Sequence, residues 1–150
     1  MGYSEGTSGR VFILRLKSGE ILHESVERFA RDNGISAATV MAVGGADKGS
    51  MLTVGPAVPV TSPIEPLHHV LDAPCELTGN GTIFENASGE PIFHMHCSCG
   101  REGQSVTGCV RSGVFVWLVM EIVISEILGT DAKRLKDPDS GFELLVPGAE

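Results

Sequence analysis

The stretch Phe93-His94-Met95-His96-Cys97-Ser98-Cys99, followed by Thr107-Gly108-Cys109-Val110, decides how the fold of this chain is interpreted. Side chains alternate between the two faces of a β-strand, so His94 and His96 share one face while Cys97 and Cys99 share the other. The polar, glycine-bearing segment 100–103 has the length of a hairpin loop, with residues 104–110 returning as the partner strand. The sequence therefore predicts an antiparallel hairpin that carries two imidazoles on one face.

The register of this hairpin determines which other side chain joins the histidines. If Cys99 lies opposite Gln104, then Cys109 lies directly across from His94, and directly opposed residues share a face. Imidazole nitrogen and thiolate sulfur are ligands of Zn²⁺, and three protein ligands leave a fourth position for water or substrate. We therefore expect His94, His96 and Cys109 to hold Zn²⁺, whereas Cys97 and Cys99 are expected to pack in the core.

The same residues also permit an interpretation without a metal. Histidines on a strand can be solvated on an open sheet face, and Cys109 can be a small core residue. The His-x-His spacing is far less specific than paired Cys-x-x-Cys motifs, so spacing alone leaves both interpretations open.

Length and composition are those of one soluble globular domain. The chain has 150 residues, of which 42% are hydrophobic and 20% charged. We expect a flexible terminus over residues 1–9 and a single domain over residues 10–150. The four cysteines do not form the pattern of a secreted disulfide framework and no signal peptide precedes them, so reduced thiols in the cytoplasm are expected.

The charge and hydropathy patterns argue against two classes of partner. The longest apolar run, residues 114–124, is interrupted by Glu121 and is too short to cross a bilayer, so it predicts a buried central strand and no membrane span. Net charge is −8, and the eleven Lys and Arg residues are scattered from Arg10 to Lys136. Non-specific affinity for DNA comes from neutralising phosphates, so no specific nucleic-acid binding is expected.

The remaining pattern predicts an α+β fold in which a mostly antiparallel β-sheet packs with one main N-terminal helix. An amphipathic helix is expected over residues 20–33, with Ser18 as its N-cap and Asn33-Gly34 as its end. Strands are expected over residues 10–17, 35–43, 48–54, 76–84, 90–99, 104–110, 114–125 and 142–146, the later ones continuing as a meander, with a charged linker before the last.

Two further features bear on the site. The four prolines of residues 55–67 predict a long loop, after which His68 and His69 either approach the hairpin or lie in solvent. Glu121 is the most suggestive acid or base, because a carboxylate in an apolar strand is costly to bury unpaired. A structural ion pair at a subunit contact is an equally good account of Glu121, and its facing depends on the length of the turn around Ser112-Gly113.

Four segments together resemble the plants-and-prokaryotes conserved domain, the PPC domain, of the type that stands alone in prokaryotes. They are Gly9-Arg10-Val11-Phe12-Ile13-Leu14-Arg15-Leu16, Ala42-Val43-Gly44-Gly45-Ala46, Glu76-Leu77-Thr78-Gly79-Asn80, and Gly89-Glu90-Pro91-Ile92-Phe93-His94-Met95-His96. The family pattern continues to a Gly-Gly-His-Leu segment, where this chain has Thr107-Gly108-Cys109-Val110. Cysteine thus stands where a histidine is usual, and it keeps a zinc-compatible ligand type.

This resemblance implies a homotrimer whose subunits meet through sheet surfaces. It also implies distant fold kinship to acetolactate decarboxylases, which hold zinc through a comparable His-x-His hairpin with a further histidine downstream. Plant members carry an Arg-Gly-Arg-Pro AT-hook, and this sequence has none.

The sequence thus favours a metal-binding, homotrimeric cytoplasmic protein that acts on or senses a small polar or carboxylated metabolite. Whether it catalyses a reaction is left open. The alternative is a non-enzymatic trimeric module for protein interaction or DNA-associated regulation, in which any metal serves structure.

Overall fold

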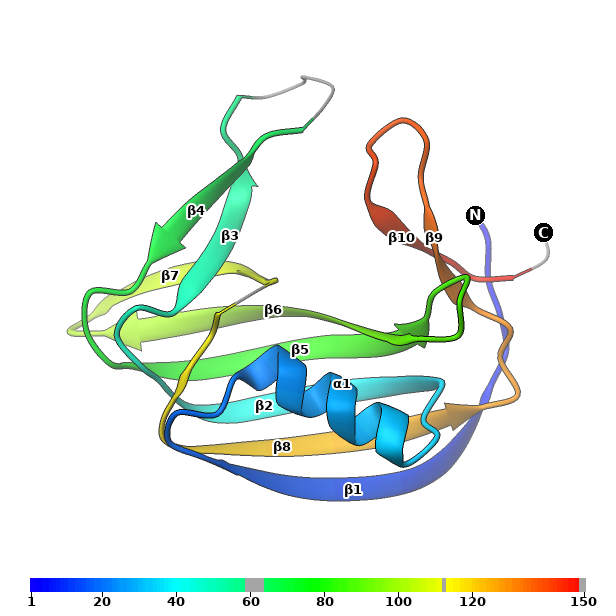
Figure 1. The fold of residues 1–150 in the computed structure, drawn as a ribbon, viewed down its shortest axis with the longest axis horizontal. Helices are drawn as coiled ribbons and strands as arrows, with labels where there is room; N and C mark the ends of the chain where they lie inside the picture. Colours follow the sequence, from blue (N-terminus) through cyan, green and yellow to red (C-terminus); the bar gives the residue numbers. More distant parts are fainter. Residues whose placement is uncertain (59–63, 112, 149–150) are drawn as a thin grey trace.

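A single antiparallel sheet dominates the computed structural model, which describes residues 1–58, 64–111 and 113–148 (Figure 1). Within these residues eight strands are hydrogen-bonded in the order β1-β8-β2-β5-β6-β7-β3-β4. The strands are β1 (Thr7–Lys17), β2 (Ala37–Ala46), β3 (Met51–Pro56), β4 (Pro66–Val70), β5 (Cys75–Glu85), β6 (Pro91–Arg101), β7 (Gln104–Val110) and β8 (Val116–Leu128). A separate hairpin pairs β9 (Lys133–Lys136) with β10 (Glu143–Val146). The predicted α+β class, mostly antiparallel with one main helix, is confirmed.

The helix α1 (Leu22–Asp32) covers one face of the sheet (Figure 1). Its buried side chains Leu22, Val26 and Ala30 enter a core built from the alternate residues of the strands beneath. That helical spacing of apolar residues supplies the stripe that a sheet-covering helix needs. The helix begins after Ile21, with no side-chain cap, so the expectation of a Ser18 cap was wrong; its expected end is confirmed by Gly34, which has φ of +63°.

The opposite face of the sheet, which we call the open face, carries the other half of each strand. One row of paired residues crosses it from β1 to β3. In order, the row contains Ile13, Val123, Met41, Asn80, His96, Cys109 and Thr53. Directly paired residues project to the same side, so the two candidate ligands of this row lie on the open face, away from α1.

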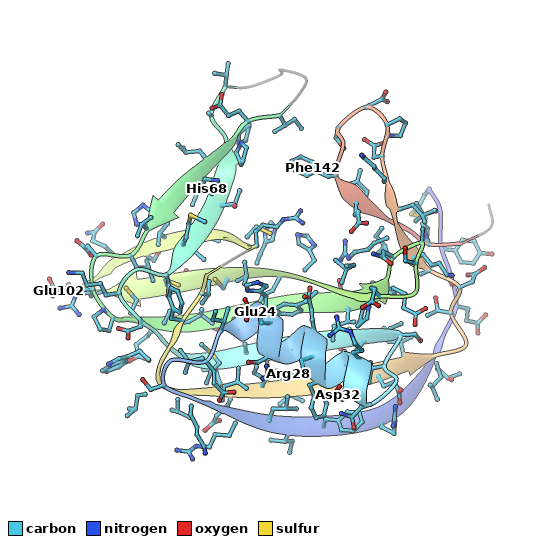
Figure 2. All side chains as sticks on the ribbon, in the orientation of Figure 1. Glu24, Arg28, Asp32, His68, Glu102 and Phe142 are labelled. Carbon is cyan, nitrogen blue, oxygen red and sulfur yellow. The ribbon has the colours of Figure 1, made fainter. Side chains whose placement is uncertain are left out.

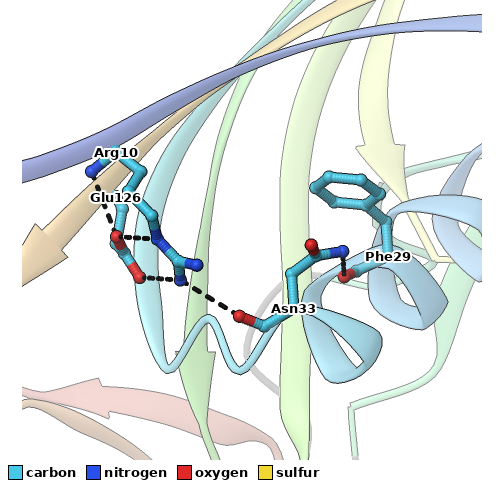
Figure 3. Close-up of polar contacts among 4 residues, drawn as sticks. All are labelled: Arg10, Phe29, Asn33 and Glu126. Carbon is cyan, nitrogen blue, oxygen red and sulfur yellow. Dashed lines mark hydrogen bonds and ion pairs between the residues drawn. The ribbon is translucent and has the colours of Figure 1, made fainter.

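An ion pair ties the start of β1 to β8 and to the end of α1 (Figure 3). The Arg10 guanidinium donates to both carboxylate oxygens of Glu126, at 2.8 and 2.6 Å, and the Arg10 backbone N–H donates to the same carboxylate. Another Arg10 N–H donates to the carbonyl of Asn33, whose side chain donates to the Phe29 carbonyl.

The N-terminal residues are more ordered than expected. Residues 7–9 were expected in a flexible terminus, but β1 begins at Thr7 and includes them.

The order of strands differs from the predicted meander at one point. β7 pairs with β6 and β3, whereas β8 crosses to the far side of the sheet and lies between β1 and β2. β7 and β8 are therefore not neighbours, and the expectation that a turn around Ser112-Gly113 joins them as paired strands was wrong. Ser112 itself is outside the described residues. The predicted loop over 55–67 includes residues 59–63, which are also outside them, and β4 begins at Pro66.

Two hairpins rise from the ends of the sheet, β3–β4 at one end and β9–β10 at the other (Figure 1). The expected last strand, 142–146, corresponds to β10, whereas its partner β9 is not among the strands that the sequence predicts. Among the described residues, no helix is long and apolar enough to span a membrane.

Candidate metal centre

Three side chains of the β6–β7 hairpin converge on the open face. One ligand atom from each of His94, His96 and Cys109 lies within 4.8 Å of the other two. The two imidazole rings are nearly perpendicular, with centroids 5.1 Å apart, and exposure falls from His96 through His94 to the buried Cys109. The predicted residues are thus brought together in an arrangement that could hold a metal ion.

The register that produces this convergence differs from the expected one. Arg101 pairs with Gln104 across a turn in which Glu102 and Gly103 have φ of +52° and +76°. Two left-handed residues make a type I′ turn, whose twist matches that of the strands it joins. Cys109 therefore lies opposite His96 rather than His94. The displacement is two residues, so Cys109 stays on the histidine face.

β3 closes the site on its β7 side. Thr53 pairs with Cys109, and a Cβ on Gly108 would lie 2.8 Å from the Thr53 carbonyl oxygen. Only glycine permits this close approach of the two strands. Cys109 is buried beside β3 while its sulfur still reaches the histidines.

A pocket of about 490 Å³ opens above the three side chains. The walls come from β3, β4 and the segment before β10; Figure 2 shows His68 and Phe142 on the two opposing hairpins. The described lining residues are Thr53, Gly55, Pro56, Ile64, Pro66, His68, His94, His96, Cys109, Arg111 and Phe142. This volume suits a small molecule.

Two arginines border the candidate ligands. Arg111, just beyond β7, lines the pocket with its guanidinium 5.7 Å from the centre of the Phe142 ring. Arg134 of β9 is 5% exposed, and its Nη2 donates to Thr82 Oγ1 at 2.9 Å. Thr82 pairs with His94 across β5 and β6, so this guanidinium lies beside the histidine.

The surroundings keep His94 neutral. Burial first, and then the positive charges of Arg134 and Arg111, lower the pKa of His94 to about 4. A neutral imidazole is the form that binds metal. Burial raises the pKa of the Cys109 thiol, while the two arginines oppose that rise, so metal binding there would displace a proton.

The remaining cysteines are separate from this site. Cys97 and Cys99 are buried on the core face, as predicted, and a hydrogen bond between their side chains raises the pKa of Cys97. Cys75 is buried beside Cys99, and all four cysteines are free.

The other candidate residues are distributed differently from expectation. Glu121 is exposed and paired with Arg15 and Val43, and β2 and β5 separate β8 from β6. Three strand spacings amount to roughly 14 Å, so Glu121 is not in this site and that suggestion was wrong. His68 lies in β4 and lines the pocket, where its Nδ1 is 3.3 Å from Thr53 Oγ1. His69 borders a different hollow, with Asp72 and Arg101.

The sequence reasoning did not identify Arg111, Arg134 or Phe142. The segment Lys133-Arg134-Leu135-Lys136 has no apolar alternation that would indicate a strand, and nothing local shows that it returns to the end of β5. A site whose walls come from hairpins far apart in the sequence can be recognised only from the three-dimensional structure.

These features define an antiparallel α+β protein with an open site of two nitrogen donors and one sulfur donor on the uncovered face of its sheet. The chain belongs to the Plants and Prokaryotes Conserved (PCC) domain family, whose model matches residues 3–128. The predicted resemblance is thereby confirmed.

Solved structures share the fold over nearly the whole chain. A plant- and prokaryote-conserved protein from Pyrococcus horikoshii is 25% identical, with a TM-score of 0.83 over 100% of both chains. A metal-containing protein from Archaeoglobus fulgidus is 24% identical, with a TM-score of 0.83 over 97% of this chain and 99% of that one. A protein from Bacteroides thetaiotaomicron, provisionally described as DNA-binding, is 17% identical, with a TM-score of 0.74 over 97% and 99%. No curated protein matches the chain.

Proposed function

We propose that this protein binds Zn²⁺ through His94, His96 and Cys109 and uses the open coordination position to act on or sense a small polar or carboxylated metabolite. The observation that carries the proposal is the approach of the three ligand atoms to within 4.8 Å at the base of a pocket. A structural zinc site closes its fourth position with protein, whereas here the described residues offer three donors.

The donor set supports zinc over other common ions. Mg²⁺ and Ca²⁺ prefer oxygen ligands, whereas imidazole and thiolate suit Zn²⁺. The A. fulgidus relative of the fold is described as metal-containing, which agrees with the proposal. A zinc ion with an open position would polarise a carbonyl or activate water.

Among its described residues, the pocket lining contains no carboxylate. If the protein is an enzyme, His68 is the lining residue available for proton transfer, since it neither belongs to the three-donor group nor lies in the core. If it is a sensor, ligand binding at the zinc is sufficient. The proposal covers both.

Zinc analysis of the dialysed protein tests the assignment directly. We expect about one zinc per chain by elemental analysis, removed by a strong chelator and restored by added Zn²⁺. An X-ray anomalous map at the zinc edge should then place the ion between the three residues. A chain free of zinc after purification and after incubation with Zn²⁺ would exclude the proposal.

Assembly as a cytoplasmic homotrimer is part of the same proposal. The support is apolar area on the open face, where Val11, Ile13, Met41 and Val43 are between 48% and 83% exposed. Most apolar residues of 114–124 do not add to this area, because Val114, Val116, Met120, Ile122 and Ile124 are buried. Exposed apolar patches of this kind mark contact surfaces.

DNA binding is not part of this proposal. The described pocket is small and walled, and the chain has net charge −8 with no basic stripe. The DNA-binding description belongs to relatives below 25% identity, which share the fold alone.

A further inference from the structure

The pocket carries the opposite charge to the rest of the molecule. The whole chain has net charge −8, yet the described pocket lining contains the Arg111 guanidinium and no carboxylate, and its His94 imidazole is neutral. A wall lined by one sign of charge raises the local concentration of ligands of the other sign. The pocket is therefore suited to an anion.

Arg111 presents its charge to this space with no carboxylate partner among the described residues, and its side chain is hydrogen-bonded to Cys109. Its side chain is exposed and lines the pocket, and no salt bridge to it is found among the described residues. The Phe142 ring, 5.7 Å away, orients the guanidinium, since arginine stacks favourably on aromatic faces. The five donors of the planar guanidinium match a carboxylate in two parallel hydrogen bonds.

Arg134 adds a second positive charge, which is buried. Its Nη2 donates to Thr82 Oγ1, but its Nε is buried with no hydrogen-bond partner, and no carboxylate forms a salt bridge with it among the described residues. The Glu143 carboxylate attracts this charge without a salt bridge, and a further negative charge nearby would offset more of the cost of burying it. Since Arg134 lies next to His94, an anion bound above the histidines would supply that charge.

Part of the wall is apolar. Pro56, Ile64, Pro66 and Phe142 face the same pocket, and they offer contact to hydrocarbon but no hydrogen bond from a side chain. Inorganic phosphate would leave this surface unused, whereas an organic acid would cover it. The combination of a guanidinium and apolar side chains in one pocket favours an organic anion over an inorganic one.

We propose that the ligand of this pocket is a small organic carboxylate, held at its carboxylate by Arg111 over the buried charge of Arg134, with its hydrocarbon part against Ile64 and Phe142. This inference rests on the proposed function in using the same site, and it names the class of ligand that reaches the zinc position. Arg134 acts as a positioning residue, because it is 5% exposed and is not among the described lining residues of the pocket.

Calorimetric titration with three probes tests the class of ligand. The probes are isobutyrate, its neutral amide isobutyramide and inorganic phosphate, each added to zinc-loaded and to zinc-free protein. We expect isobutyrate to bind roughly 10- to 100-fold more tightly than isobutyramide, because hydrogen bonds to a charged group are the stronger ones. Equal binding of acid and amide, or tighter binding of phosphate than of isobutyrate, would overturn the inference.

A pair of arginine variants tests the position. Arg111→Gln should weaken isobutyrate binding roughly 10- to 100-fold, and Arg111→Lys should restore part of the loss, since lysine keeps the charge without the fork. Arg28→Gln makes the same charge change on exposed α1, on the covered side of the sheet, and should leave binding unchanged. Isobutyrate affinity that is the same in Arg111→Gln as in wild type would refute the assignment.

Zinc content, measured on the same samples, separates this inference from the proposed function. Zinc-loaded protein that binds no isobutyrate overturns the inference and leaves the metal site standing. Protein that never retains zinc but binds isobutyrate through Arg111 supports the inference and overturns the zinc assignment.

Discussion

The Arg10 guanidinium and the Glu126 carboxylate form a two-point ion pair between β1, the edge strand of the sheet, and its neighbour β8 (Figure 3). Glu126 is 6% exposed, and its hydrogen bonds from Arg10 lower its pKa to about 2. Because Arg10 also binds the Asn33 carbonyl, the pair joins the sheet to the end of α1. This ion pair is therefore a structural contact near the β1 edge of the sheet, and β2 and β5 separate it from the β6–β7 site.

Replacing Glu126 with Gln should destabilise the fold in a pH-dependent way. Above pH 4.5 the wild-type carboxylate is charged in both states, and we expect the variant to lose about 1–2 kcal/mol, the low end for a hydrogen bond to a charged group, because the Arg10 side chain is 53% exposed. Since the folded pKa of Glu126 lies below its unfolded value, the contribution is fully present above about pH 4.5 and is lost as pH falls toward 2. Urea unfolding at pH 7 and pH 3 measures both values.

Glu121→Gln is the matched control for this prediction. Glu121 lies in the same strand, is exposed and forms no salt bridge among the described residues. Its replacement should change the free energy of unfolding by less than about 0.5 kcal/mol. A wild-type advantage over Glu126→Gln that does not shrink on acidification would contradict the assigned role of the charge.

Sequence-specific DNA binding should be absent. The chain is acidic, its lysines and arginines are scattered, and the sequence has no Arg-Gly-Arg-Pro AT-hook. Contacts to phosphates supply most of the affinity of a protein for DNA, so a chain without a basic cluster should bind DNA weakly at any sequence. Fluorescence anisotropy at physiological salt should show no submicromolar binding; selective submicromolar binding to one duplex over an unrelated duplex would reverse this conclusion.

The candidate ligands were predictable from the sequence because they depend only on local rules. Strand alternation places His94 and His96 on one face, and an error of two residues in the hairpin register leaves Cys109 there. The sequence predicts a longer turn than the structure contains. The observed two-residue turn requires a left-handed conformation at Glu102, and an Asn-Gly pair would have indicated such a turn where Glu-Gly does not.

The surroundings of the ligands depend on long-range pairing. The insertion of β8 between β1 and β2 decides that Glu121 lies far from the histidines, although both are on strands of one sheet. The return of β9 beside β5 brings Arg134 to Thr82, from residues more distant in sequence than any local pattern reaches. Composition and periodicity carry no information on these pairings.

A homotrimer is expected in solution. Ile13, in the first strand, is 83% exposed and lies on the open face in a row with Val123 and Met41. Light scattering at micromolar concentration should therefore return three chain masses, and Ile13→Arg should shift the mass to that of one chain, because a charge at a closed apolar contact is strongly unfavourable.

Leu144→Arg serves as the comparison for the trimer. Leu144 is 45% exposed but belongs to β10, outside the eight-stranded sheet, so the variant should keep the wild-type mass. Wild-type protein that is monomeric throughout would reject the trimer, and loss of the trimer in Leu144→Arg alone would move the contact to the hairpin.

The sharpest prediction about the site concerns two adjacent residues of β6. His96 faces the open side and the pocket, whereas Cys97 faces the core, 2% exposed. His96→Ala removes one of three donors and should weaken zinc retention by at least about tenfold, since loss of even a supporting partner of a ligand costs that much. Cys97→Ser removes a thiol of the same strand without touching the site, and it should keep its zinc.

Elemental analysis of both variants and of the wild type after identical dialysis measures the zinc content, and thermal unfolding establishes that each protein is folded. Equal zinc in His96→Ala and wild type would falsify the ligand set, and zinc lost only in Cys97→Ser would place the ion on the core side of the sheet.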